Sequence, residues 1–281
     1  MQLDIAAGFR RLSVSNLAWP SQVDDAALDL LVELGFEGVE LAPSKVFGDL
    51  KAIALREVRA YRRRVEGRGL SVSALQAILF GVPGVHLFES PASRERMAGH
   101  LRRVAEIAGE LGAGACVFGS PTLRDPGTRS TDQALAIAEE FLSSVALDFA
   151  VQGVELCFEA NPSIYQCRFV TRTQEAFDLV DRMNVPGIAM KLDTGTMFIN
   201  GEEPSIIRQV ERRIGHFHVS EPNLVPIGET GIDHTPIAEA LNGSTYAQWI
   251  SIEMKEVDDW CRAVRRAYRL VHSQYREMKD A

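Results

Sequence analysis

The chain has 281 residues, of which 46% are hydrophobic and 24% charged, a composition typical of a soluble globular protein with a sizeable core. Its formal net charge of −8 argues against a nucleic-acid partner, whose phosphates need a basic face, and against an anionic membrane surface. The apolar runs are too short to span a bilayer, and no apolar core with a cleavage site marks the N-terminus, so we expect a soluble, unprocessed protein.

The cysteines give no sign of a structural metal site or a disulfide framework. The four are Cys116, Cys157, Cys167 and Cys261, and their spacings match no CxxC zinc pattern. We therefore expect reduced thiols in a cytoplasmic protein.

The first half of the chain alternates short strands with apolar-periodic helices. Strands are predicted at residues 11–16, 38–42, 71–76 and 115–119. Helices are predicted at residues 24–34, 50–68, 93–111 and 131–151, with a polar loop at 43–49. Asp24 or Asp25 caps the first helix and Gly35 ends it.

The second half keeps the same rhythm. Strands are predicted at residues 154–159, 188–193, 214–219 and 249–253, and helices at 173–183, 205–211, 236–241 and from about 258 onward. Eight βα units predict the α/β class and a closed (β/α)8 TIM barrel. No linker divides the chain, so residues 1–281 are expected to form a single domain. The alternative is an open doubly wound sheet, which the lack of a GxGxxG motif after the first strand disfavours.

Four strands of the second half end in chemically useful side chains, Glu159, Asp193, His218 and Glu253. A single acidic residue at a strand end is more often a helix cap or a surface charge. Because parallel strands of one barrel end on the same rim, four such ends predict convergence instead. Their mixed oxygen and nitrogen atoms suit Mn²⁺, Co²⁺ or Mg²⁺, with Zn²⁺ as a further candidate, better than the thiolate-rich set of structural zinc.

The motifs around these residues resemble those of the xylose isomerase-like barrels, the superfamily of sugar phosphate isomerases and epimerases. Its members include ketose 3-epimerases, hydroxypyruvate isomerase, inosose dehydratase and an apurinic endonuclease branch. The resemblance extends over residues 16–253 and lies in the order and spacing of Phe-Glu159-Ala-Asn-Pro, Leu-Asp193-Thr-Gly, His216-Phe-His218-Val-Ser-Glu221 and Ser-Ile-Glu253-Met. It implies that Glu159, Asp193, His218 and Glu253 hold one divalent metal ion. It also implies that both glutamates transfer protons, and it favours a dimer or tetramer.

Such a site predicts a metal-dependent sugar isomerase or epimerase. Removing a proton beside a carbonyl creates an enediolate, whose charge a metal stabilises while two carboxylates act as base and acid. Loss of a β-hydroxyl at the same site would instead make a dehydratase or lyase of a sugar or inosose-like substrate, and the ligand set does not choose between these reactions. A non-catalytic carbohydrate-binding barrel is a third reading, against which the matched pair Glu159 and Glu253 argues.

Departures from the family pattern narrow the range of substrates that we expect. Ketose 3-epimerases usually carry a histidine where this chain has Thr196, and tend to carry an arginine where it has Leu224. Both family residues contact substrate, which argues against a simple free ketose. The endonuclease branch needs further histidines where this chain has Gln76 and Gly119-Ser120, so DNA cleavage is not expected.

Other polar residues on the predicted rim are candidate substrate contacts. They are Asn16, Trp19, Glu40, Gln76, Asn161, Lys191, His216, Glu221 and His234. Strand parity turns Lys191 and His216 into the barrel. Lys191 is read either as salt-bridged there or as a substrate contact, and His216 as the partner that orients a carboxylate or a substrate hydroxyl. The aromatic rings of Trp19, Phe47 and Phe80 either wall a sugar ring or pack at the barrel rim.

Overall fold

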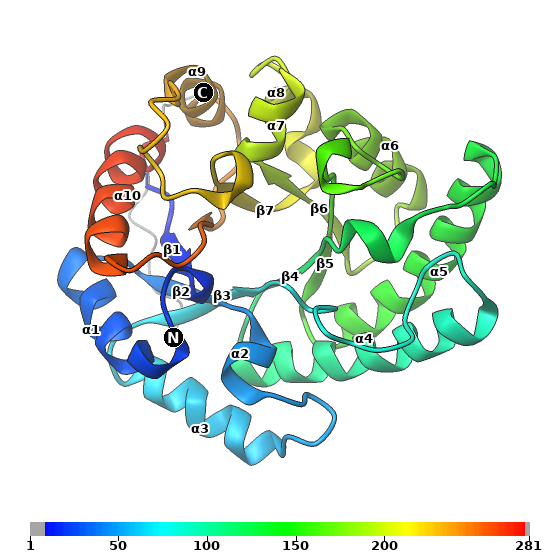
Figure 1. The fold of residues 1–281 in the computed structure, drawn as a ribbon, viewed down its shortest axis with the longest axis horizontal. Helices are drawn as coiled ribbons and strands as arrows, with labels where there is room; N and C mark the ends of the chain where they lie inside the picture. The colour runs from blue at the N-terminus through cyan, green and yellow to red at the C-terminus, as the bar shows by residue number, and fades with distance from the viewer. Residues whose placement is uncertain (1–8, 279–281) are drawn as a thin grey trace.

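The computed structural model describes residues 9–278, and eight parallel strands within them close into a barrel in chain order (Figure 1). The strands are β1 Leu12–Ser15, β2 Gly38–Leu41, β3 Ser71–Leu75, β4 Ala115–Phe118, β5 Glu155–Glu159, β6 Ile188–Asp193, β7 Ile214–Val219 and β8 Ile250–Ile252. The pairing of β1 with β8 closes the ring. The predicted (β/α)8 barrel is therefore confirmed, and the open sheet is excluded. The predicted unprocessed N-terminus concerns residues outside the described range.

Helices surround the barrel and connect its strands (Figure 1). They are α1 Asp24–Leu34, α2 Pro43–Phe47, α3 Leu55–Glu66, α4 Pro91–Leu111, α5 Thr131–Val151, α6 Thr173–Met183, α7 Thr194–Asn200, α8 Ile206–Val210, α9 Thr235–Asn242 and α10 Trp260–Tyr275. Most predicted helices are present within a few residues of their expected bounds.

Four local predictions were wrong. Asp24 and Asp25 do not cap α1, because the helix already begins at Asp24 and its N-cap residue is Val23. The expected polar loop at 43–49 contains α2, which begins with Pro43 in the first turn, where proline's missing N–H costs nothing. Helix α3 begins at Leu55 and not at residue 50. Helix α7 was not expected. It begins directly after Asp193, whose side chain accepts a hydrogen bond from the Thr196 amide and caps the helix.

Small residues fill the barrel interior beneath the rim. Ala74, Ala115, Cys157 and Ala189 form a buried cluster of their own. Gly215 lies against it, since a Cβ there would come within 2.7 Å of Ala189 Cβ. The register between β6 and β7 shifts at this point, so that Lys191 pairs with His216 and Asp193 with His218. This bulge sets the polar ends of the two strands at one height.

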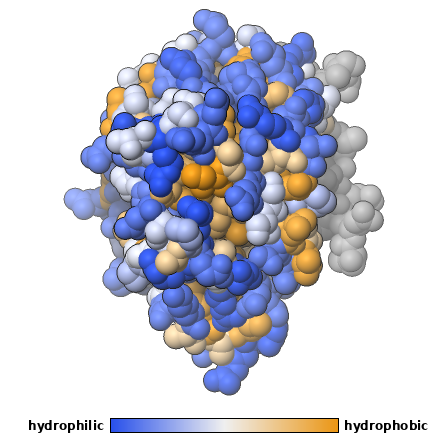
Figure 2. Space-filling model, turned by 90° about the vertical axis from the view of Figure 1, so that its right-hand side faces the viewer, coloured by the Kyte–Doolittle hydropathy of each residue, from blue (hydrophilic) through white to orange (hydrophobic). Residues whose placement is uncertain are grey.

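The face of the molecule drawn in Figure 2 is mainly hydrophilic. Figure 2 shows polar side chains over most of the face to the right of Figure 1, with hydrophobic side chains between them and near its centre. No helix in residues 9–278 is long and apolar enough to cross a membrane. All four cysteines are free thiols, as expected.

Candidate functional site

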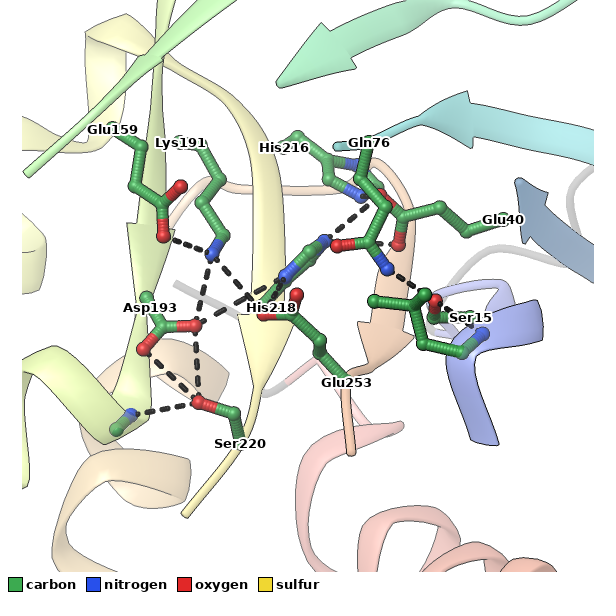
Figure 3. A network of polar contacts seen from close by, with 12 residues as sticks. Ser15, Glu40, Gln76, Glu159, Lys191, Asp193, His216, His218, Ser220 and Glu253 are labelled. Carbon is green, nitrogen blue, oxygen red and sulfur yellow. Dashed lines mark hydrogen bonds and ion pairs between the residues drawn. The ribbon is translucent and has the colours of Figure 1, made fainter. Parts of the chain in front are cut away.

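The ends of β5, β6, β7 and β8 bring Glu159, Asp193, His218 and Glu253 together (Figure 3). Glu159 lies opposite Lys191 in the β5–β6 pairing, and Asp193 lies opposite His218 in the β6–β7 pairing. Glu253 follows β8 directly, and its amide donates a hydrogen bond to the Val219 carbonyl at the end of β7. The convergence expected from four strand ends is present.

The ammonium group of Lys191 lies in the middle of these carboxylates (Figure 3). Its Nζ is 2.7 Å from Oε1 of Glu159, 2.9 Å from Oδ2 of Asp193 and 3.7 Å from Oε2 of Glu253. The residue is 2% exposed. Burial lowers the pKa of Lys191, but the three carboxylates outweigh burial and raise its pKa above the usual value, so the side chain is a cation.

Asp193 is held from several directions. Its Oδ1 accepts a hydrogen bond from the Thr196 amide at 2.8 Å, and both of its oxygens lie 3.0 Å from Oγ of Ser220. Burial raises the pKa of Asp193, yet Lys191 and His218 outweigh that effect and lower it. The carboxylate is thus ionised and rigidly placed.

A second buried polar group lies deeper in the barrel and is built from Glu40, His216 and His218. Nε2 of His218 lies 3.0 Å from Oε1 and 2.9 Å from Oε2 of Glu40, while its Nδ1 lies 3.0 Å from Oε2 of Glu253. Burial raises the pKa of Glu40, but the two imidazoles outweigh it and hold that pKa well below its usual value.

The two histidines of this group differ in charge. Burial lowers the pKa of His218, but the attraction of Glu40, together with Glu253, exceeds burial and the repulsion of Lys191 and raises the pKa to about 9. His216, 3.4 Å from Glu40, keeps a lowered pKa because burial dominates there.

Two groups of described residues have ligand atoms close enough for a metal ion. One is Glu40, His216 and His218, and the other is Asp193, His218 and Glu253, with atoms within 4.8 Å of one another in each. Carboxylate oxygens bind such ions at about 2.0–2.2 Å. Lys191 already donates to Glu159 and Asp193, so an ion bound to those oxygens would lie against its ammonium group.

The electrostatic repulsion between a divalent ion and the Lys191 ammonium at this site would be large. At about 3 Å separation and an effective dielectric constant of about 20, a divalent ion and an ammonium repel each other by roughly 10 kcal/mol. The four predicted ligands therefore do not fit one divalent ion while Lys191 keeps this position.

A cavity of about 680 Å³ opens above the carboxylates, a volume typical of small-molecule sites. Its wall includes the predicted site residues Gln76, Glu159, Asn161, Asp193, Glu221 and Glu253. Thr196 and Leu224, the two departures from the family pattern, also line it, as does the ring of Phe80, which is 76% exposed. The cavity thus combines a polar floor with apolar sides.

Other predicted contacts lie behind this wall. They are Asn16, Trp19, Glu40, Lys191, His216 and His234, each at most 2% exposed. Asn16 accepts a hydrogen bond from the Ala42 amide, and Trp19 packs against Trp260 and donates to Asp24. Nδ1 of His234 lies 2.8 Å from the Tyr275 hydroxyl. Their positions suit support of the rim better than direct contact with a ligand. Phe47 packs against Tyr61, as the rim-packing reading expects.

Some residues of the site were not predicted. Nη2 of Arg124, fully buried, donates to Oδ1 of Asn161 at 2.8 Å. The hydroxyl of Tyr165 accepts a hydrogen bond from the Asn223 amide and so joins the loops after β5 and β7. Gly119 makes room for Glu159, since a Cβ there would lie 2.5 Å from its Oε2. Ser220, which holds Asp193, could be placed from the sequence, because it continues the strand face that carries His216 and His218.

Comparisons with known proteins identify the family. The family model described as a xylose isomerase-like TIM barrel matches residues 28–271. The structure is similar to that of 3-keto-D-glucoside 4-epimerase YcjR from E. coli, with TM-score 0.77, 17% identity, and coverage of 94% of this chain and 99% of that one. D-psicose 3-epimerase from Clostridium cellulolyticum H10, with D-tagatose, gives TM-score 0.79 at 16% identity and the same coverage.

A structure of the IolI protein with a bound zinc atom gives TM-score 0.74 at 16% identity, covering 94% of this chain and 99% of that one. No curated protein matches the chain by sequence. At these identities the structural likeness establishes the fold alone, whereas the family model covers most of the sequence. The chain belongs to the xylose isomerase-like TIM barrel family.

Proposed function

We propose that this chain is a sugar epimerase or isomerase that moves a proton on a carbon beside a carbonyl group. The observation that supports this most is the pair Glu159 and Glu253, which come from β5 and the end of β8 and both line the same cavity. Two carboxylates at one cavity can serve as base and acid in turn. A binding protein has no need of this pair.

The proposed reaction uses the carboxylates in two balanced steps. One glutamate takes the proton from the substrate carbon, and the electron pair of the broken C–H bond moves into the carbonyl to give an enediolate. The other glutamate, which carries a proton at the start, gives that proton to carbon as the enediolate electron pair forms the new C–H bond and a carbonyl forms again. Return to the opposite face of the same carbon is epimerisation. Return to the neighbouring carbon, with the hydroxyl proton passing to the former carbonyl oxygen, is isomerisation.

The cavity supports a substrate with both hydroxyl groups and an apolar face. The amides of Gln76 and Asn161 can donate to or accept from hydroxyls, and the ring of Phe80 offers a surface for C–H groups. The similar structures include a keto-glucoside 4-epimerase and a D-psicose 3-epimerase, which supports a keto sugar. Thr196 and Leu224 in the wall support a keto sugar other than a simple free ketose.

Several broader expectations from the sequence stand apart from this proposal. Dependence on Mn²⁺, Co²⁺, Mg²⁺ or Zn²⁺ was expected from the mixed oxygen and nitrogen side chains and from the family resemblance, and the proposed reaction uses no metal ion. A cytoplasmic location, a homo-oligomer, the lack of a nucleic-acid partner and a single domain over residues 1–281 stay predictions from the sequence.

Solvent deuterium exchange tests the proposed function. The protein is incubated in D₂O with a panel of free ketoses, keto-glycosides, inososes and sugar acids, and the substrates are then examined by NMR. Incorporation beside a carbonyl in wild type and in Glu256→Gln, an exposed rim carboxylate, is the expected result. Conversion of the substrate into its deuterium-labelled epimer or isomer is expected to be lost in both Glu159→Gln and Glu253→Gln, because the conversion needs both carboxylates. Equal exchange in all four proteins would exclude the glutamates as the proton-transfer pair.

A further inference from the structure

We propose that the ammonium of Lys191 occupies the cation site of this barrel in place of a divalent metal ion, and that the chain therefore works without one. The first part, that the ammonium occupies the cation site, does not depend on the reaction. The second part, that the chain works without a metal ion, rests on the proposed function.

The position of Lys191 follows from its strand. It lies two residues before Asp193 on β6, so both side chains point to the same face of the strand. It also pairs with Glu159 across the β5–β6 ladder. A lysine at this point extends its long side chain toward the rim and ends among the carboxylates there (Figure 3).

The carboxylates that Nζ of Lys191 contacts are those of the predicted metal ligands. An ammonium has three donors. Two of them reach Glu159 and Asp193 at 2.7 and 2.9 Å, and the third nearest carboxylate is Glu253 at 3.7 Å. Three of the four residues that the family resemblance assigns to the metal thus face one lysine.

An ion that displaces Lys191 would break its hydrogen bonds to Glu159 and Asp193. Beneath it on the inner face lie the small buried side chains of Ala189 and Cys157, and the single carboxylate of Glu155 lies beside them. A buried ammonium without a partner is costly. A divalent ion at these oxygens would therefore have to displace a paired charge from a site that already suits that charge.

The ammonium also places a positive charge among three acidic side chains. It lies behind the cavity wall, whereas Glu159, Asp193 and Glu253 line the wall. Lys191 is thus a positioning residue. It compensates the negative charge and holds the proton-transfer pair apart without touching substrate. If Lys191 served only to stabilise the fold, replacing it would leave the metal affinity unchanged. The metal affinity of Lys191 variants therefore distinguishes the two roles.

The experiment compares Mn²⁺ binding by wild type, Lys191→Met and Lys191→Gln after chelator treatment, using EPR of free Mn²⁺ and the shift in melting temperature. Lys191→Met and Lys191→Gln free the carboxylates, so each is expected to bind about one Mn²⁺ per chain. Wild type should bind it about 100-fold more weakly or not at all. Lys51→Met, which removes an exposed lysine, should behave as wild type.

Deuterium exchange by the same proteins tests the second part. Chelator-treated wild type is expected to keep its full exchange rate with added EDTA. One tightly bound Mn²⁺ per wild-type chain, or exchange that starts only on adding metal, would overturn the proposal. If no substrate exchanges in any metal state, the proposed function fails, and the Mn²⁺ titration still decides which cation occupies the site. Lys191→Gln keeps a polar side chain, so the comparison stands even if Lys191→Met does not fold.

Discussion

Glu40 of β2 and His218 of β7 pair across the interior of the barrel, with Nε2 of the histidine 2.9 and 3.0 Å from the two carboxylate oxygens. Both side chains are completely buried. The pair fixes the imidazole ring so that Nδ1 meets Oε2 of Glu253 at 3.0 Å. Glu40 thus helps to position Glu253 at the rim by orienting the His218 ring.

Replacing Glu40 with glutamine should therefore destabilise the protein and weaken its chemistry. Breaking a buried ion pair costs about 3–5 kcal/mol. Loosening the partner that orients a site residue lowers activity by about 10–100-fold. Urea unfolding and deuterium exchange measure the two effects. An unfolding midpoint equal to that of wild type would show that the pair does not stabilise the barrel.

Substituting Gly119 with alanine should reduce activity more than stability. The added Cβ would lie 2.5 Å from Oε2 of Glu159, and this flexible carboxylate can move away. A displacement of about 1 Å at a reacting group can cost about 100-fold in rate. Gly114→Ala at the other end of β4 is the matched control, because nothing lies within 4 Å of its added Cβ. Similar exchange rates in the two variants would contradict a close contact at Gly119.

Substituting Gly215 with alanine should destabilise the fold itself. Its Cβ would come within 2.7 Å of Ala189 Cβ and 2.9 Å of Cys157 Sγ in the packed interior. Overpacking of this kind costs about 1–3 kcal/mol. Gly99→Ala in α4 has open space around it and should stabilise the helix by about 0.5–1 kcal/mol. Thermal melts of the two variants should move in opposite directions.

Acidification should destabilise the protein in part through His100. Its Nε2 lies 2.7 Å from the Ile78 carbonyl, and burial lowers its pKa below the ordinary value of 6.5 despite that contact. The unfolded chain then takes up a proton near pH 6.5 that the folded chain does not, so stability is complete above this pH and falls as pH drops through it. His100→Gln should reduce the fall in the free energy of unfolding between pH 7 and 5, which urea titrations at several pH values can measure. If the free energy of unfolding falls with pH as steeply as in wild type, other groups cause the loss.

The barrel could be predicted because each βα unit carries its own local pattern, an apolar run that ends in a polar residue followed by a periodic helix. The rim residues Glu159, Asp193, His218 and Glu253 followed from the rule that parallel strands end on one side. Helix α7 could not be predicted, because Asp193 serves both as strand end and as helix cap. Sequence parity turned Lys191 inward, but parity does not give the three distances that place its ammonium among the carboxylates.

Contacts between distant strands were the least predictable. The approach of Glu40 to His218 depends on closure of the barrel and on the bulge at Gly215, neither of which a local pattern encodes. The burial of Trp19 and His234 depends on α10, whose Trp260 and Tyr275 pack against them. Arg124 follows no motif, and only the folded loops bring it to Asn161.

The direct test of a two-carboxylate mechanism is deuterium exchange measured separately from each of the two epimers that the proposed reaction interconverts. Glu159 and Glu253 should each serve one face of the carbon. Glu159→Gln should therefore lose wash-in from one epimer by about 10²–10⁴-fold, and Glu253→Gln should lose it from the other. Equal loss of exchange from both epimers in one variant, with none in the other, would contradict this account and leave a single carboxylate as the proton carrier.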